Sequence, residues 1–389
     1  MQAEFCNLNS IPVGPLGIIP MASCQTLGEK IDRHLVSWRR DREHEHKSTI
    51  ALQEYEKDSY IIHAKTPRFG SGEGKGIITE SVRGDDLYIL VDVCNYSLTY
   101  RMSGVENHMS PDDHFQDLKR IIAAAEGKAK RINVIMPFLY ESRQHKRSGR
   151  ESLDCALALQ ELTKMGVDNI ITFDAHDPRV QNAIPLHGFE TIQPVYQFIK
   201  GLFKATPDLH ISKDTMMVIS PDEGGMSRAI YMANVLGLDM GMFYKRRDYS
   251  RIVDGRNPIV AHQFLGSKVE GKDLIIMDDM ISSGDSMLEV AAALKELKAN
   301  RIFLCATFGL FTNGIEKFDK AYEDGVFDYL LTTNLVYQTP ALLSRPYYTS
   351  CDLSKYLALV IDTLNHDGSI SQLLNPIDRI HKFLDKVNK

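Results

Sequence analysis

The stretch Leu274-Ile275-Ile276-Met277-Asp278-Asp279-Met280-Ile281-Ser282-Ser283-Gly284-Asp285-Ser286 predicts a buried strand, a short loop and a helix in direct succession. Its first four residues are all apolar, as in a parallel strand that is buried on both faces, and two adjacent carboxylates follow at the strand's carboxyl end. A Ser/Gly loop comes next, and apolar residues then repeat at helical spacing from Met287 to Leu297. In an open α/β sheet, ligands bind beyond the carboxyl ends of the strands, so this stretch marks a candidate binding site.

The loop offers groups that suit both halves of a sugar phosphate. A Ser/Gly loop that leads into a helix N-terminus presents backbone N–H groups and hydroxyls to a phosphate. Asp278 and Asp279 suit the vicinal hydroxyls of a ribose, or the metal that accompanies a diphosphate. The alternative is an ordinary buried strand, a turn and a helix capped by Ser282 or Ser283. Paired acids beside Ser-Ser-Gly-x-Ser are uncommon by chance, and we therefore favour the sugar-phosphate site.

This loop resembles the 5-phosphoribosyl 1-diphosphate (PRPP) loop of the type I phosphoribosyltransferase fold. The resemblance implies that Asp278 and Asp279 bind the ribose hydroxyls, directly or through a second metal. It also implies that the 5-phosphate of ribose is bound by Ser282, Ser283, Gly284, Asp285 and Ser286. The loop alone does not separate phosphoribosyltransferases from ribose-phosphate pyrophosphokinases (PRPP synthetases), so the rest of the chain has to decide.

Composition narrows the class of protein. The chain has 389 residues, enough for two domains, and its net charge of -6 argues against a nucleic-acid binder. It contains no apolar run of membrane-spanning length and no signal-peptide pattern at its N-terminus, so we expect no membrane partner. Its six cysteines are scattered without metal-binding or disulfide spacing. These features predict a reduced, cytoplasmic enzyme.

Two segments in the first half are candidates for nucleotide binding. The turn that contains Phe69, Ser71 and Glu73 is by spacing alone a glycine-rich hairpin, yet with the strand after it the turn resembles the ATP-contacting turn of PRPP synthetases. There the aromatic ring stacks on adenine. A basic run follows the predicted strand 132–137 and suits a polyphosphate, although a solvated loop has the same composition. The resemblance implies ATP contacts from Arg143, Gln144 and His145, and His145 stands where the family has Asp.

Two further strand ends carry candidate metal ligands. His176 follows the predicted strand 169–173; a histidine at such a place is usually an ordinary surface side chain, but the matching residue of PRPP synthetases helps to hold Mg²⁺. Asp222 lies at a strand end before a Gly-Gly turn, which favours a metal or phosphate contact over a plain turn. The resemblance therefore implies Mg²⁺ bound by His176 and Asp222.

A third strand tip bears three cations. By resemblance, Lys245 and Arg247 stabilise the charge on the transferred group, as cations do in phosphoryl transfer. The polar segment 248–262 after them shows no apolar periodicity, and we expect it to be disordered without ligand and to close over the phosphates as a lid.

The resemblance covers most of the chain, from about residue 69 to about residue 374, and it implies the fold. We expect an α/β protein with two tandem phosphoribosyltransferase-like domains, each a mainly parallel sheet flanked by helices. Residues 1–195 form the nucleotide-binding domain, completed by a C-terminal helix at 365–389, and residues 196–364 form the domain with the PRPP loop. Residues 39–58 are dense in charge and predict a solvated helix or an insertion. The segments 37–60 and 92–113 are longer than the family usually has.

A phosphoribosyltransferase needs only one such domain, so two joined domains with nucleotide elements favour a PRPP synthetase. The implied reaction joins ATP and ribose 5-phosphate to give PRPP and AMP, and the family forms homo-oligomers, namely hexamers. Two alternatives remain at this stage. One is a catalytically silent regulatory subunit, which His145 and the unusual loop favour; the other is a phosphoribosyltransferase that uses PRPP.

Overall fold

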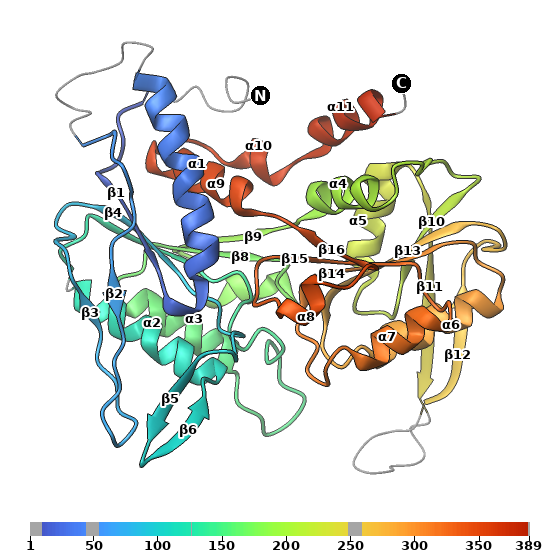
Figure 1. The fold of residues 1–389 in the computed structure, drawn as a ribbon, viewed down its shortest axis with the longest axis horizontal. Coiled ribbons are helices and arrows are strands. Elements are labelled where there is room, and N and C mark those ends of the chain that lie inside the picture. Colours follow the sequence, from blue (N-terminus) through green and yellow to red (C-terminus); the bar gives the residue numbers. More distant parts are fainter. Residues whose placement is uncertain (1–9, 44–53, 126, 248–258, 388–389) are drawn as a thin grey trace. The chain divides into compact units, whose positions relative to one another are not determined.

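The computed structural model describes residues 10–43, 54–125, 127–247 and 259–387, which divide into two compact units. Unit 1 consists of residues 1–194, 334–337 and 352–375, and unit 2 consists of residues 195–333, 338–351 and 376–389. Each unit is built around its own sheet (Figure 1). No helix of the described residues is long and apolar enough to cross a membrane.

The described part of unit 1 contains a parallel five-stranded sheet. Its strands, in spatial order, are β1 (Leu16–Pro20), β4 (Asp86–Leu90), β7 (Arg131–Ile135), β8 (Asn169–Phe173) and β9 (Gly188–Ile192). The second strand of this order, β4, is buried along its whole length, as is typical of a parallel strand covered on both faces. Since all strands run the same way, the loops after β4, β7 and β8 emerge at one edge of the sheet.

The other elements of unit 1 are helices and two small hairpins. The helices are α1 (Gln25–Glu43), α2 (Pro111–Ala125), α3 (Asp154–Lys164), α9 (Ser354–Asn365) and α10 (Ser371–Leu374), with 3₁₀ turns at η1 (Ala22–Cys24) and η3 (Pro178–Ala183). The small antiparallel pairs are β2 (Ala64–Lys65) with β3 (Ile77–Ile78), and β5 (Thr99–Met102) with β6 (Val105–His108). The long segment 92–113 is thus not a plain connection, because it contains the β5–β6 hairpin.

The described part of unit 2 contains a seven-stranded sheet in which only the edge strand is antiparallel. In spatial order the strands are β12 (Ile259–Leu265), β11 (Asp239–Arg247), β10 (Met216–Ser220), β13 (Asp273–Ile281), β14 (Ile302–Gly309), β15 (Tyr329–Thr333) and β16 (Tyr348–Cys351). The edge strand β12 shows that residues 259–262 are not part of a structureless polar segment, as the sequence predicted, but pair with β11.

Helices cover both faces of this sheet, because residues of the central strand alternate between two cores. Ile275 and Met277 pack on one face with α4 (Val195–Ala205), α5 (Met226–Leu236) and α11 (Ile377–Val387). Leu274 and Ile276 pack on the other face with α6 (Asp285–Glu296), α7 (Glu316–Glu323) and α8 (Pro340–Leu343), as Figure 1 shows. The predicted strand 274–277 is therefore real, but it continues to Ile281 because β14 pairs with it as far as Gly309.

Two sequence-based expectations about the chain ends differ from the structure. The segment that returns to unit 1 is 352–375, which carries α9, whereas α11 lies in unit 2 because Ile380 is buried in the core beside α4. The charge-dense stretch begins in α1, where Arg40 and Asp41 are exposed as expected, but Arg39 is only 1% exposed because this helix packs on α9. Residues 44–53 of that stretch lie outside the described residues.

Candidate active site

Two carboxylates near the end of β13 form the acidic centre of unit 2. Asp279 is only 3% exposed, its N–H donates to Asp278 Oδ1 at 2.9 Å, and its Oδ2 lies 3.6 Å from Nη2 of Arg228. Burial raises the pKa of Asp278 well above its usual range, and the neighbouring Asp279 and Asp222 carboxylates raise it further. This crowded acidic pair therefore favours the binding of a proton, a hydroxyl donor or a cation.

The loop between β13 and α6 needs glycine at its tightest point. Gly284 has φ 83°, and a Cβ atom there would lie 2.3 Å from the ring of Phe318. Gly284 is also the N-cap of α6, so neither Ser282 nor Ser283 occupies that position. Ser283 Oγ lies 3.5 Å from the Asp285 N–H, and Ser282 Oγ lies 3.5 Å from Thr312 Oγ1. Hydroxyls and a helix N-terminus therefore meet in this loop, which is the arrangement that binds a phosphate.

Asp285 and Ser286 are the first two residues of α6. A carboxylate at this position would repel a phosphate, but Asp285 Oδ1 accepts a hydrogen bond from Lys317 Nζ at 2.5 Å. The Lys317 ammonium group lowers the pKa of Asp285, which therefore stays ionised while its charge is offset.

Asp222 stabilises the turn after β10. Its Oδ1 accepts the N–H groups of Gly224 at 2.8 Å and Gly225 at 3.2 Å, and Ser220 Oγ donates to the Asp222 carbonyl at 2.6 Å. One carboxylate oxygen is therefore used to shape the Gly-Gly turn. Because β10 and β13 are parallel neighbours, this turn lies at the same sheet edge as Asp278.

Lys245 and Arg247 lie in β11, which pairs with β12. Lys245 is opposite His262, and the register shifts between Arg246 and Arg247. The side chains of 245–262 and all of 248–258 lie outside the described part of the chain, so the roles of these two cations and the expected lid stay predictions.

In unit 1, the turn that carries Phe69 is closed by its own backbone. Phe69 N–H donates to Glu73 O at 2.7 Å, Gly72 N–H donates to Phe69 O at 2.9 Å, and Ser71 Oγ donates to Glu73 Oε2 at 2.8 Å. The Phe69 ring is 54% exposed. A large aromatic side chain held at the surface in this way offers a face on which a base can stack.

The basic loop after β7 contains the other predicted nucleotide contacts. Arg143 is exposed, and Gln144 Nε2 donates to Ser152 O at 2.9 Å, so the glutamine amide helps to close the loop. The ring of His145 lies 5.4 Å from that of His176, centroid to centroid. The structure therefore brings together two residues that the sequence placed at separate strand ends.

Two acids at the same edge of this sheet were not selected from the sequence. Asp92 is buried just after β4 and accepts the N–H groups of Cys94 at 2.8 Å and Tyr337 at 2.7 Å. Asp174 is buried just after β8, with φ 37°, and accepts a hydrogen bond from Gln193 Nε2 at 3.1 Å. The signal that could have identified both is an acid directly after an apolar run, the same pattern that selected Asp278.

Comparisons with known proteins agree with this two-unit arrangement. The sequence profile of the N-terminal domain of ribose phosphate pyrophosphokinase matches residues 16–166, and that of the phosphoribosyl transferase domain matches residues 189–339. The chain is 30% identical over 317 residues to the ribose-phosphate pyrophosphokinase of Vibrio vulnificus. The matched region covers 80% of this chain and 91% of the Vibrio protein. It is 30% identical over 273 residues to the Mycoplasma genitalium protein of the same name, over 69% and 74% of the two chains.

The fold has a counterpart among solved structures. The crystal structure of phosphoribosylpyrophosphate synthetase from Mycobacterium smegmatis superposes with a TM-score of 0.71 and 22% identity, covering 91% of this chain and 99% of that one. Two tandem phosphoribosyltransferase-like domains are therefore the fold of this chain.

Proposed function

The chain belongs to the ribose-phosphate pyrophosphokinase family, and on that basis we propose that it transfers the β,γ-diphosphoryl group of ATP to the anomeric hydroxyl of ribose 5-phosphate. The products are PRPP and AMP. The observation that carries this proposal is the presence of both family domains on one chain, since a phosphoribosyltransferase needs only the second.

Ribose 5-phosphate is assigned to unit 2. The loop of Ser282, Ser283, Gly284, Asp285 and Ser286 leads into α6, which supports binding of the 5-phosphate there. Asp278 and Asp279 bind the ribose hydroxyls, and the raised pKa of Asp278 supports a role as hydrogen-bond donor or cation ligand. Lys245 and Arg247 stabilise negative charge on the transferred group, a role that suits their position near the carboxyl end of β11, which pairs with β10 in the same sheet.

ATP is assigned to unit 1. The exposed ring of Phe69 stacks on the adenine, and the turn that Ser71 and Glu73 close holds that ring. Arg143, Gln144 and His145 lie in the basic loop and face the polyphosphate. No residue is assigned as a general base, because phosphoryl transfer depends mainly on alignment and charge stabilisation.

The donor groups at the strand ends suit a divalent cation, which we take to be Mg²⁺. His176 in unit 1 and Asp222 in unit 2 are each assigned as a cation ligand. The buried His145 Nδ1, which has no hydrogen-bond partner among the residues that the structure describes, is one more donor beside His176. When bound, the metal neutralises charge on the phosphate oxygens. By family resemblance we also propose that the protein is cytoplasmic and forms a homo-oligomer, namely a hexamer. Light scattering would measure the size of this assembly.

The test is incubation of the full-length protein with ATP, Mg²⁺ and ribose 5-phosphate, with AMP and PRPP followed by ³¹P NMR. We expect equal amounts of AMP and PRPP. Lys245→Ala should lower kcat by orders of magnitude and leave the KM for ribose 5-phosphate nearly unchanged, because a cation that acts in the transition state affects kcat. ADP as the product, or no turnover at all, would overturn the proposal.

A further inference from the structure

Two imidazole rings meet at the edge of the unit 1 sheet. His145 lies in the loop after β7 and His176 lies in the loop after β8, and these strands are parallel neighbours. The ring centroids are 5.4 Å apart, with 57° between the ring planes. When two imidazoles bind one metal tetrahedrally, with metal–nitrogen distances of about 2.1 Å, the ring centres are about 5 Å apart. The observed separation is close to that value.

The two nitrogens of His145 have different surroundings. Nε2 lies 3.5 Å from Asp177 Oδ2, whereas Nδ1 is shielded from solvent and has no hydrogen-bond partner in the part of the chain that the structure describes. Asp177 Oδ1 accepts hydrogen bonds at 2.9 Å from both the N–H and the Nε of Arg179. Arg179 Nη2 also pairs with Asp177 Oδ2, so the oxygen that faces Nε2 belongs to an ion-paired carboxylate.

A histidine with a carboxylate at one ring nitrogen and an open lone pair at the other is a common arrangement in metal sites. A metal-bound histidine commonly donates its second ring N–H to a carboxylate, which fixes the tautomer and makes the ligating nitrogen more basic. Here the carboxylate favours the N–H at Nε2, which leaves the lone pair at Nδ1. A histidine kept only for packing would be expected to use both nitrogens, because a buried polar atom without a partner is costly.

We propose that His145 and His176 together bind the divalent cation that accompanies the nucleotide, and that this two-imidazole site favours Co²⁺ or Ni²⁺ relative to Mg²⁺. Imidazole suits the later transition metals, whereas Mg²⁺ prefers oxygen ligands. Among the side chains that the structure describes, no group of three or more His, Cys, Asp or Glu is placed to hold a metal alone. Phosphate oxygens of the nucleotide and water therefore complete the coordination.

The inference rests on the nucleotide and metal roles proposed for unit 1, so its test needs a readout besides turnover. The full-length protein is titrated with Co²⁺ and with Mg²⁺ by calorimetry in the presence of a non-hydrolysable ATP analogue. Loss of an outer-shell partner alone typically costs about 10–100-fold in metal affinity. His145→Asp should therefore weaken Co²⁺ binding at least about tenfold, while Mg²⁺ binding changes less or improves, because the variant replaces a nitrogen donor with oxygen.

The number of imidazole ligands is measured directly by pulsed EPR of bound Mn²⁺, through the coupling of nitrogen nuclei to the metal. The wild-type protein should show two imidazole nitrogens, His145→Gln and His176→Asn one each, and the double variant none. His187→Asn is the matched control, since His187 is exposed in the loop before β9. His145→Gln removes the imidazole but keeps a neutral side chain of similar length. Thermal unfolding of each variant shows whether it is folded, so that loss of a ligand can be told apart from misfolding.

The outcomes distinguish this inference from the proposed function. If the protein makes AMP from ATP and ribose 5-phosphate, but the Co²⁺ affinity and the nitrogen couplings do not change in the His145 variants, the two-imidazole site is wrong and the enzyme assignment stands. If two imidazoles are counted but no AMP forms, the metal site stands and the proposed function fails.

Discussion

At the scale of single residues, the loop of unit 2 that we propose binds the 5-phosphate contains an acid, Asp285. Lys317 Nζ lies 2.5 Å from Asp285 Oδ1, and both side chains are partly exposed. An exposed pair of this kind contributes little to stability. We therefore expect the Lys317–Asp285 pair to affect the affinity for ribose 5-phosphate, because Lys317 reduces the repulsion between the Asp285 carboxylate and the 5-phosphate.

The corresponding prediction concerns the affinity for ribose 5-phosphate. Two unit charges about 4 Å apart in water interact by about 1 kcal/mol, so Lys317→Met should raise the Kd for ribose 5-phosphate roughly fivefold. The double variant Lys317→Met with Asp285→Asn should recover most of the loss. Calorimetry measures both, and Lys320→Met on the same helix is the control. An unchanged Kd in Lys317→Met would mean that the phosphate binds elsewhere.

A second prediction at this scale follows from the buried Asp92. Burial raises its pKa to about 7, although the N–H groups of Cys94 and Tyr337 oppose the rise. Between about pH 4, where an unfolded Asp titrates, and pH 7, the folded protein holds a proton that the unfolded chain has lost. The free energy of unfolding should therefore fall as the pH rises through this window, by on the order of 4 kcal/mol, and become flat above it.

Asp92→Asn should remove this pH dependence, even if the substitution also changes the free energy of unfolding by the same amount at every pH. Urea unfolding between pH 4 and pH 8 measures the slope, and hydrogen exchange in β4 assigns the slope to unit 1. Asp58→Asn is the control, because the Asp58 side chain is fully exposed. Equal slopes in the wild-type and Asp92→Asn proteins would show that Asp92 is ionised throughout this range.

At the scale of elements, the β5–β6 hairpin is tied to the turn that carries Phe69. Ser103 N–H at the hairpin tip donates to Gly70 O at 2.8 Å. The Arg68 guanidinium lies 5.0 Å from the centre of the Tyr100 ring. Gly72, at φ 95°, lies so close to Met102 that a Cβ there would be 2.8 Å from its sulfur. These contacts hold the turn in one position, so ATP binding at this turn, as proposed above, would have less conformational entropy to remove.

We therefore predict that a short Gly-Ser turn in place of residues 99–108 raises the KM for ATP several-fold. The kcat and the KM for ribose 5-phosphate should change little, because the hairpin belongs to unit 1, whereas the loop proposed to bind ribose 5-phosphate and the cations proposed to act in transfer belong to unit 2. Steady-state kinetics and hydrogen exchange at 68–75 test this. Val105→Ser, at an exposed hairpin position, is the control. A KM for ATP equal to that of the wild-type protein would leave the hairpin without this role.

Much of the element order was predictable because its signals are local. The apolar run before Asp278, the glycine at 284 and the helical spacing from Met287 define a strand, a loop and a helix without any distant partner. The length of β13 was not predictable, because pairing with β14 extends it past two acids to Ile281. The buried Arg39 was missed for the same reason, since the residue that makes its burial possible lies 323 positions away.

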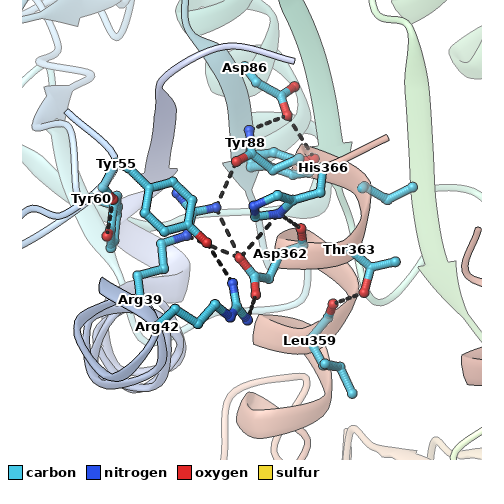
Figure 2. A network of polar contacts seen from close by, with 12 residues as sticks. Arg39, Arg42, Tyr55, Tyr60, Asp86, Tyr88, Leu359, Asp362, Thr363 and His366 are labelled. Atoms are coloured by element: carbon cyan, nitrogen blue, oxygen red, sulfur yellow. Dashed lines mark hydrogen bonds and ion pairs between the residues drawn. The ribbon is translucent and has the colours of Figure 1, made fainter. Parts of the chain in front are cut away.

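At the scale of the whole molecule, segments from the two ends of the chain meet in a buried network of charges. Arg39 in α1 donates to Asp362 Oδ1 in α9 through Nε at 3.1 Å and Nη2 at 3.0 Å. Arg42 also pairs with Asp362, and Figure 2 shows both arginines and His366 directed toward this carboxylate. Arg39 Nη2 donates to Asn365 Oδ1 at 2.6 Å. Asn365 in turn donates to Asp86 Oδ2 at 2.9 Å, which extends the network to β4.

This network predicts that unit 1 depends on a residue near the end of the sequence. Burial opposes the ionisation of Asp362, but the charges of Arg39 and Arg42 outweigh it and lower the pKa of Asp362. Asp362→Asn leaves two arginines without a counter-charge, and removal of one partner of a buried pair costs about 3–5 kcal/mol. We expect a loss of that size in the free energy of unfolding at pH 7, measured by urea unfolding.

The control is the exposed pair between Lys30 Nζ and Asp352 Oδ2, at 2.9 Å, which links α1 to the segment just before α9. Lys30→Met should cost less than about 1 kcal/mol, because water already screens that pair. Because the pKa of Asp362 is lowered on folding, its contribution is present above about pH 4 and is lost as the pH falls through the folded-state pKa. The stability difference between the wild-type and Asp362→Asn proteins should therefore shrink in acid. A difference that is small at pH 7, or that does not depend on pH, would show that the buried network does not hold α9 to unit 1.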